Sequence, residues 1–332
     1  MDSKFLIPKT IYIGGSGITK RIDNLQKLGC GILRFAVPDT KSALSLVKIA
    51  EYTPMPLVAD IHFDYKLALE CLKGNVAAIR INPGNIGSRD RVEAVVNACK
   101  EKGAAVRIGV NSGSLPKDLA QLVEQGKMSR AKALSETAIR EVSVFNELNF
   151  DQVVVSMKAS SVQETIESNE TFASQYDIPL HIGVTEAGPL ITGVVKSTLA
   201  FSKLIKEGIG STIRVSLSST PENEVITGRE ILHECGKLSG GVTIISCPRC
   251  GRQGFDVHGF VDRWQNELLS LDKNITVAVM GCVVNGPGEG KHADIGIAGA
   301  GNKAIIFKKG EIVRTIDSKD ADKIFREELN SL

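Results

Sequence analysis

The chain has 332 residues, of which 42% are hydrophobic, 23% are charged and 5% are aromatic, and its formal net charge is +2. This length suffices for one large domain with a smaller one, or for two domains. The nearly balanced charge excludes an overall nucleic-acid or membrane footprint, and the scarcity of aromatic side chains argues against base-stacking platforms. An anion site would therefore have to arise from local clustering of cations.

The cysteine content favours a reducing compartment. The N-terminal residues contain no apolar run long enough for a signal peptide, and no stretch approaches the length of a membrane span. Seven cysteines, an odd number, then favour free thiols or metal ligands over disulfides. We therefore predict a cytoplasmic protein that binds neither nucleic acid nor membrane. Four of these thiols are expected to be small buried hydrophobes: Cys30, Cys71, Cys99 and Cys235.

A repeated unit fills the chain from Thr10 to about Lys237. Each unit has a short β-branched apolar run followed by an amphipathic stretch, which indicates βα units and a parallel sheet. The apolar runs begin near Ile11, Ile32, Leu57, Ala77, Ala105, Val153, Leu180 and Thr212. Eight such units predict a closed (β/α)8 barrel of the TIM type. A doubly wound sheet is the alternative, but Gly14-Gly15-Ser16-Gly17 matches its G-x-G-x-x-G turn only weakly.

The helical stretches of these units are the next elements in the chain. They include Lys41–Ala50, Arg89–Lys102, Ala131–Leu148, Val162–Gln175 and Lys196–Glu207. In a barrel, such helices pack outside the strands, so functional side chains are expected at the strand ends instead.

Five predicted strands carry a cation near the carboxyl end. Alternate positions of a barrel strand point inward, and the carboxyl ends form the catalytic face. The five cations are Arg34, Arg80, Arg107, Lys158 and Arg214. Internal ion pairs with Asp60 or Glu186 could neutralise one or two of them, but five cations against two acids leave surplus positive charge. Because uncompensated buried charge is costly and arginine suits phosphate oxygens, we predict a phosphate or diphosphate ligand.

Neutral hydrogen-bonding residues occupy the same level of the predicted barrel. Each of them could contact the ligand or could instead cap a neighbouring helix. They are Asn82, Asn111, Thr185 and Ser216.

The glycine-containing segment Gly236–Gly241 is the predicted domain boundary, which gives a barrel of residues 1–238 and a second domain of residues 239–332. The second domain reads as a small α+β module. Its strands are expected at Val242–Ile245, Ile275–Met280, Ile295–Ala298 and Ala304–Phe307, and its helices near Val261–Leu271 and Ser318–Leu329.

Three cysteines and a carboxylate form a frame in this second domain. Cys247 and Cys250 are two residues apart on a Pro/Gly turn, Cys282 follows the apolar run Ile275–Met280 on a second such turn, and Glu289 lies on that same turn. Three interpretations remain open from spacing alone. They are a structural zinc with His258 or His292 as fourth ligand, a four-iron cluster with three thiolates, and thiols that only pack.

Seven motifs in order resemble the 4-hydroxy-3-methylbut-2-enyl diphosphate synthases of the methylerythritol phosphate route to isoprenoids. The resemblance extends over about Ile32 to Thr315 and favours the iron–sulfur interpretation of the cysteine frame. The matching strings are Leu57–Asp64 (LVADIHFD), Ile79–Gly87 (IRINPGNIG), Arg107–Leu115 (RIGVNSGSL), His181–Gly188 (HIGVTEAG), Thr212–Leu217 (TIRVSL), Cys247–Arg252 (CPRCGR) and Ala278–Glu289 (AVMGCVVNGPGE).

The resemblance implies a (β/α)8 barrel followed by a small α+β iron–sulfur domain of the sulfite-reductase-like kind. It implies a homodimer in which the cluster domain of one subunit covers the barrel mouth of the other. The implied substrate is 2-C-methyl-D-erythritol 2,4-cyclodiphosphate. The implied reaction is a two-electron reductive ring opening with loss of water, and flavodoxin or ferredoxin supplies the electrons.

The same resemblance assigns roles to individual residues. Cys247, Cys250, Cys282 and Glu289 match the ligands of a 4Fe-4S cluster. Glu186 matches a proposed acid/base residue, although a counter-ion to Arg107 or Arg214 is an equally open role. The matches to diphosphate- and polyol-binding positions are Arg34, Arg80, Asn82, Arg107, Asn111, Lys158, Thr185, Arg214 and Ser216.

The N-terminus departs from the family pattern. The family carries a Gln-Ser-Met-Thr-Asn-Thr string between its early Gly-Gly and its first helix, whereas Gly14-Gly15 here is followed at once by the predicted helix Lys20–Leu28. The first strand is then expected at Thr10–Ile13, or the seam of the barrel is altered. Ser211 also replaces the usual aspartate before Thr212. Two rival functions remain: a phosphate-ligand-binding barrel with a zinc knuckle, and a pterin-type barrel transferase, which has no use for the three cysteines.

Overall fold

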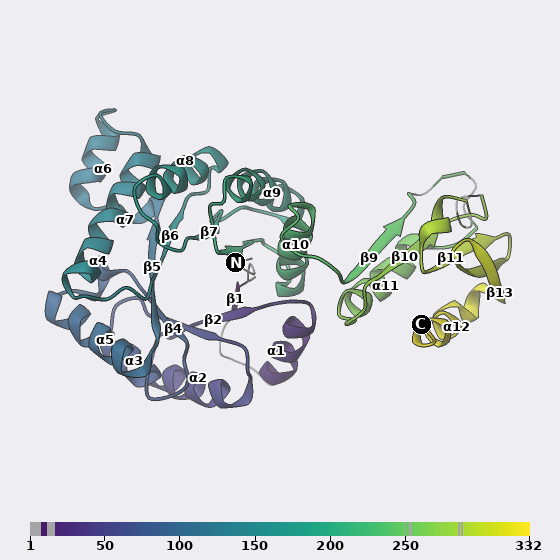
Figure 1. The fold of residues 1–332 in the computed structure, drawn as a ribbon, viewed down its shortest axis with the longest axis horizontal. Helices are drawn as coiled ribbons and strands as arrows, with labels where there is room; N and C mark the ends of the chain where they lie inside the picture. The colour runs from purple at the N-terminus through teal and green to yellow at the C-terminus, as the bar shows by residue number, and fades with distance from the viewer. Residues whose placement is uncertain (1–7, 12–16, 249, 252–253, 285, 287) are drawn as a thin grey trace. The chain divides into compact units, whose positions relative to one another are not determined.

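The computed structural model describes residues 8–11, 17–248, 250–251, 254–284, 286 and 288–332. The chain divides into two compact units, Met1–Leu238 and Ser239–Leu332, each of which is described by itself (Figure 1). None of the helices among the described residues is both long and apolar enough to cross a membrane.

The first unit is a parallel barrel of eight strands in the described residues. Strands β1 to β6 form one sheet in sequential order, β7 pairs with β8, and a single parallel bridge between Val155 and Leu180 links β6 to β7. β8 in turn contacts β1, so the strands close on themselves. The bounds are β1 (Pro8–Ile11), β2 (Ile32–Ala36), β3 (Leu57–Asp60), β4 (Ala78–Ile81), β5 (Ala105–Asn111), β6 (Val153–Lys158), β7 (His181–Gly183) and β8 (Thr212–Arg214).

Helices lie outside these strands, as Figure 1 shows. Side-chain caps fix several of their starts: Asp39 accepts a hydrogen bond from the backbone N–H of Ser42 at 2.7 Å, and Ser129 accepts one from Lys132 at 3.1 Å. The bounds are α1 (Ile18–Lys27), α2 (Thr40–Tyr52), α3 (Tyr65–Cys71), α4 (Pro83–Ile86), α5 (Arg89–Lys102), α6 (Lys117–Glu124), α7 (Arg130–Glu147), α8 (Val162–Ala173), α9 (Leu190–Lys206) and α10 (Pro221–Glu234).

Several boundaries differ from the sequence prediction, most of all the start of one helix. Helix α9 begins at Leu190, six residues before the predicted start at Lys196, because Pro189 occupies the N-cap position and Gly193 is accommodated within the helix. Of the predicted first strand Thr10–Ile13, Thr10 and Ile11 belong to β1, whereas residues 12–16, including Gly14-Gly15, lie outside the described residues.

The second unit is a five-stranded mixed sheet in the order β13-β12-β11-β10-β9, with two helices. Phe260, Trp264 and Phe325 form its aromatic core, with ring centroids 5.1–5.6 Å apart. The bounds are β9 (Val242–Ser246), α11 (Val257–Leu269), β10 (Ile275–Met280), β11 (Ile295–Ala300), β12 (Lys303–Lys308), β13 (Glu311–Asp317) and α12 (Ala321–Asn330), with a 3-10 turn at Glu289–His292.

The strand β13 was not predicted. The first five residues of β13 are exposed and only Ile316 is buried. The strand therefore lacks the alternation of buried and exposed residues that identifies a half-buried strand. It is an edge strand, joined to β12 by a tight turn in which Lys309 and Gly310 have φ values of 49° and 84°.

Candidate functional site

A cavity of about 170 Å³ opens at the carboxyl ends of the barrel strands. We call it the cation cavity, since all five predicted cations line it. Its described lining is Arg34, Asp60, His62, Arg80, Arg107, Gly109, Asn111, Ser156, Lys158, Thr185 and Arg214.

The strand register places several of these side chains next to one another. Asp60 on β3 is the register partner of Arg80 on β4, and Arg80 is the partner of Arg107 on β5. Asn111 at the end of β5 pairs with Lys158 at the end of β6. Arg107 itself pairs with Val154, so Lys158 lies four residues further along the strands, and both long side chains nevertheless line the same cavity.

Asp60 neutralises part of this charge. Its carboxylate lies 3.4 Å from Nη1 of Arg34, 3.1 Å from Nη1 of Arg80 and 3.7 Å from Nε2 of His62, and only 4% of the residue is exposed. Burial raises the pKa of this carboxyl, but Arg34 and Arg80 outweigh the burial and hold the pKa below its ordinary value. Asp60 is therefore an anion in the folded protein, shared by two arginines.

The other three cations have no such partner. Within the described residues, Arg107, Lys158 and Arg214 form no ion pair, and the Nε atoms of Arg107 and Arg214 are buried without a hydrogen-bond acceptor. Burial, together with the neighbouring arginines, lowers the pKa of Arg107 to about 10 and that of Arg214 to about 9. Burial and Arg214 lower the pKa of Lys158 well below its ordinary value.

Electrostatics of this kind favour an anionic ligand. Buried donors normally form hydrogen bonds, and a buried charged donor without an acceptor destabilises the protein. The two guanidinium Nε atoms without acceptors therefore mark positions where the oxygen atoms of a ligand could bind. A multiply charged anion with several oxygens, such as a diphosphate, would satisfy both the donors and the charge.

Of the four neutral residues predicted at the site, two line the cation cavity and two lie outside its described lining. Asn111 and Thr185 line the cation cavity. Asn82 does not; its side-chain oxygen accepts a hydrogen bond from the N–H of Gly84 at 3.1 Å and thereby caps α4. Ser216 follows β8 and is half-buried, outside the described lining. The next residue, Leu217, donates its N–H to the buried carboxylate of Glu224 at 2.8 Å, which anchors this loop.

Glu186 lies beside the cavity rather than in its described lining. It directly follows Thr185, is exposed, and has a φ of 50°, a left-handed conformation that costs energy for a residue with a side chain. Within the described residues it forms no ion pair with Arg107 or Arg214. The structure therefore gives no counter-ion contact for this carboxylate.

The prediction did not place His62, Gly109 or Ser156 among the site residues, although all three line the cavity. His62 and Ser156 could have been found from the sequence. They lie two residues from Asp60 and Lys158, at positions that the inward alternation of a strand also points into the barrel.

The cysteines of the second unit follow two neighbouring parallel strands. Cys247 comes directly after β9 and Cys282 two residues after β10. The Sγ of Cys247 accepts a hydrogen bond from the N–H of Gly281 at 3.0 Å, which links the two turns. Cys282 is buried, Cys247 is half-buried and Cys250 is exposed, and all three are free thiols.

The fit of this frame to a metal depends on the kind of centre. Among the described residues, no three His, Cys, Asp or Glu side chains are gathered closely enough to hold one metal ion. A structural zinc is usually held by four side chains at one point, whereas the thiolates of a cluster each bind a different iron. The N–H···S bond to Cys247 is of the kind that stabilises cluster thiolates. Glu289 begins the 3-10 turn, but its side chain lies outside the described residues.

The remaining cysteines behave as predicted core residues with one exception. Cys30, Cys71 and Cys99 are buried, and burial raises the pKa of Cys71 and of Cys99 to about 12. Cys235 is only partly buried, at the end of α10 near Ser202.

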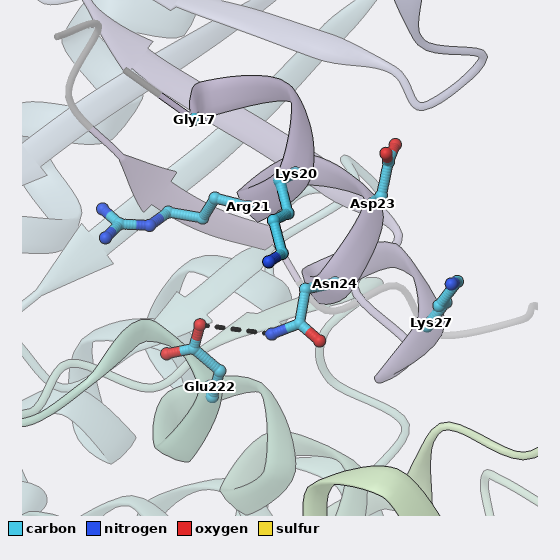
Figure 2. A pocket seen from close by; sticks show the side chains of 7 residues that line it. All are labelled: Gly17, Lys20, Arg21, Asp23, Asn24, Lys27 and Glu222. Carbon is cyan, nitrogen blue, oxygen red and sulfur yellow. Dashed lines mark hydrogen bonds between the residues drawn. The ribbon is translucent and has the colours of Figure 1, made fainter. Parts of the chain in front are cut away.

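A second cavity of about 580 Å³ lies against the outer face of α1. Figure 2 shows Asn24 on α1 reaching Glu222 on α10 through a hydrogen bond of 3.4 Å. Three cations and two carboxylates line this surface, so its surplus of positive charge is much smaller than that of the cation cavity. Its described lining is Gly17, Lys20, Arg21, Asp23, Asn24, Lys27 and Glu222.

The fold and the cation cavity define a TIM-barrel protein with a positively charged cavity at the carboxyl ends of its strands and a thiol-bearing C-terminal domain. The chain belongs to the GcpE family: the GcpE TIM-barrel domain matches residues 15–229, and the GcpE protein C-terminal domain matches residues 243–331. The family resemblance, the barrel fold and the enzymatic function expected from the sequence are confirmed.

Relatives named 4-hydroxy-3-methylbut-2-en-1-yl diphosphate synthase (flavodoxin) match nearly the whole chain. The Treponema denticola protein is 52% identical, with 98% of this chain and 99% of the relative covered. The Treponema pallidum protein is 58% identical, with 95% and 82% covered, and the Clostridium acetobutylicum protein is 48% identical, with 96% and 95% covered. The Treponema denticola alignment spans 382 residues, so that relative contains residues that this 332-residue chain lacks.

Solved structures share the barrel. Dihydropteroate synthase from Thermus thermophilus superposes with a TM-score of 0.50 at 14% identity, covering 72% of this chain and 95% of that one. The Yersinia pestis enzyme with a pterine-sulfa conjugate gives 0.50 at 11% identity, covering 71% and 93%. At such low identity the likeness concerns the fold alone.

Proposed function

We propose that this chain catalyses the reductive ring opening and dehydration of 2-C-methyl-D-erythritol 2,4-cyclodiphosphate to 4-hydroxy-3-methylbut-2-enyl diphosphate, and that the substrate binds in the cation cavity. One observation carries the binding proposal. Among the described residues, Arg107, Lys158 and Arg214 face one cavity without a carboxylate partner, and two of their side chains hold orphaned Nε donors. A cyclic diphosphate supplies both the missing acceptors and the missing negative charge.

The cations would act in binding and in bond breaking. Arg107, Arg214 and Lys158 would hold the diphosphate, while Arg34 and Arg80 stay fixed by Asp60 and present their remaining donors. When the ring opens, the bridging oxygen leaves carbon and its charge passes onto the diphosphate. Donors already fixed in a low-dielectric cavity stabilise that developing charge at no reorganisation cost. Asn111 and Thr185 line the same cavity and would bind the polyol.

Loss of the hydroxyl requires a proton. Glu186 follows Thr185 and stands at the cavity's edge in a strained left-handed conformation. We assign it the role of the acid that protonates the departing hydroxyl, so that it leaves as water. Its exposed position and the absence of a described ion pair support this role over that of a counter-ion to Arg107 or Arg214. Asn82 and Ser216 would act indirectly, by holding the loops after β4 and β8.

The second unit, residues 239–332, would carry a 4Fe-4S cluster, while residues 1–238 bind the substrate. Cys247, Cys250 and Cys282 would supply three thiolates and Glu289 a carboxylate to the fourth iron. An oxygen ligand exchanges more readily than a thiolate, which would leave one corner open to substrate oxygen. When bound, such a cluster supplies the two electrons of the ring opening one at a time. The seven free thiols support a reducing compartment such as the cytoplasm.

We propose flavodoxin as the electron donor, as in the names of the relatives, with ferredoxin as an alternative carrier. We also propose a homodimer in which the cluster of one subunit serves the barrel of the other. Mixing two inactive variants tests this arrangement. Arg107→Ala removes a substrate-binding cation and Cys250→Ser removes a cluster ligand, so mixed dimers would regain one complete site. If the mixture stays inactive after subunit exchange, each chain serves its own barrel.

Anaerobic purification with metal and sulfide analysis tests the cofactor. The proposal expects iron and acid-labile sulfide, each about four per chain for an intact cluster, and a brown protein. A colourless protein with stoichiometric zinc would instead support a phosphate-binding barrel with a zinc knuckle. Turnover that survives serine at Cys247, Cys250 and Cys282 would favour a pterin-type transferase.

A further inference from the structure

Two glycines face the interior of the barrel at the level of the cation cavity. Gly109 lies on β5 and lines the cavity, and Gly183 ends β7. Neither has a positive φ, so the backbone conformation at these positions is open to any residue. What distinguishes the two positions is the space that a side chain would occupy.

At Gly109 that space holds the guanidinium of Arg80. A Cβ built on Gly109 would lie 2.5 Å from Nε of Arg80, 2.6 Å from its Nη2 and 2.9 Å from its Cζ, all far inside van der Waals contact. From this place the guanidinium donates to Oδ1 of Asp60 at 3.1 Å and to the carbonyl oxygen of Gly109 at 3.3 Å. Arg80 thus spans from β3 to β5 only because residue 109 has no side chain.

At Gly183 the space holds the chain of Lys158. A Cβ there would lie 3.1 Å from Cε and 3.5 Å from Cδ of Lys158, and 3.1 Å from the backbone oxygen of Arg214. Between the two glycines, Ser156 on β6 is the register partner of Gly109, and its buried hydroxyl has no hydrogen-bond partner. Three successive strands therefore present small residues at this level, beside long cations that fold across them.

The geometry points to Gly109 and Gly183 as positioning residues of the diphosphate site: their missing side chains set where Arg80 and Lys158 meet the ligand. This inference rests on the proposed function, since it assumes that these cations bind a diphosphate. A methyl group at residue 109 would push the flexible Arg80 side chain away and leave the barrel backbone in place. The fold would survive, and the preorganised charge would be lost.

Calorimetric titration with inorganic pyrophosphate tests the inference without turnover. Gly109→Ala is expected to weaken pyrophosphate binding by about tenfold or more, as misplaced binding groups do. The matched control is Gly113→Ala, a glycine in the 3-10 turn Ser112–Ser114 with no positive φ and no atom within 4 Å of its Cβ position, which should bind as the wild type does. Equal affinity of Gly109→Ala and the wild type would overturn the inference while leaving the proposed function intact.

A double-mutant cycle separates positioning from general damage. All three nearest contacts at residue 109 belong to Arg80, so in an Arg80→Ala background the Gly109→Ala change should cost no further affinity. Fully additive losses, or a double variant that fails to fold, would contradict the inference. For Gly183→Ala the Lys158→Ala background should relieve only part of the loss, because the contact with the carbonyl oxygen of Arg214 remains. A wild type that binds no pyrophosphate would contradict the proposed function, and this inference with it.

Discussion

Oδ1 of Asp60 lies 3.1 Å from Nη1 of Arg80, and this buried pair sets the charge balance of the cation cavity. The other carboxylate oxygen lies 3.4 Å from Arg34, so one anion serves two guanidinium groups. The remaining surplus of positive charge is what an anionic substrate would neutralise. The ligand-free protein therefore holds like charges together at a cost in stability.

Asp60→Asn should destabilise the ligand-free protein by roughly 3–5 kcal/mol, because it leaves Arg34 and Arg80 buried without their anion. Urea unfolding measures the loss, and saturating pyrophosphate should restore part of it by supplying negative charge. The control is Asp118→Asn, which breaks a solvent-exposed pair with Arg140 and should change the stability far less. If Asp60→Asn is as stable as the control variant, the carboxylate of Asp60 does not stabilise the protein by neutralising Arg34 and Arg80.

Pyrophosphate binding should draw protons from solution at a pH between the lowered pKa of Lys158 in the empty site and its ordinary value of 10.5. Burial and Arg214 hold the pKa of Lys158 well below its ordinary value in the empty site, and a bound anion would raise it again. Titration in two buffers of different ionisation enthalpy measures this uptake, and Lys158→Met should remove most of it. In the ligand-free protein, the lowered pKa of Lys158 also makes the free energy of unfolding depend on pH. The unfolded chain holds this proton more tightly, so stability rises with pH from the folded pKa of Lys158 towards 10.5.

Arg107→Ala and Lys158→Ala should each weaken binding of the cyclic diphosphate by roughly ten- to hundredfold, the usual loss for a hydrogen bond to a charged group. Their iron content and visible absorption should match those of the wild type, because both residues belong to the barrel unit. Lys20→Ala, in the outer cavity beside α1, is the control and should bind normally. Loss of iron in the barrel variants would contradict the assignment of substrate binding to residues 1–238 and of the cluster to residues 239–332.

Glu186→Gln should lower kcat by about 10²- to 10⁴-fold with a small change in KM, since it removes a proton donor and leaves the cations in place. A variant that changes KM alone would show that Glu186 acts in binding. Glu164→Gln, a half-buried carboxylate on α8, provides a matched control on the same barrel.

Glu289→Ala should still bind iron through three thiolates, but its cluster should decay faster in air than that of the wild type. Cys250→Ser should lose most of the iron. The rate of cluster decay in each variant is measured from the visible absorption of the cluster during exposure to oxygen. If Glu289→Ala keeps wild-type stability, the carboxylate does not serve the fourth iron.

The sequence predicted the barrel because its strands are continuous β-branched runs, and the five cations because they recur at the same point of five such runs. It could not reveal which cations are neutralised, since Asp60 reaches Arg34 and Arg80 across three strands. The roles of Gly109 and Gly183 were equally hidden, because they depend on where other side chains fold. The strand β13 lacks any alternation that a pattern could detect.

The most direct test is anaerobic turnover of 2-C-methyl-D-erythritol 2,4-cyclodiphosphate by the iron-loaded protein with a chemical reductant, with the product identified by mass spectrometry. The account predicts 4-hydroxy-3-methylbut-2-enyl diphosphate in the wild type, a reduced yield at limiting substrate in Arg107→Ala, and loss of product in Cys282→Ser. An iron-loaded wild type that leaves the cyclic diphosphate unchanged, or product formation that survives Cys282→Ser, would contradict it.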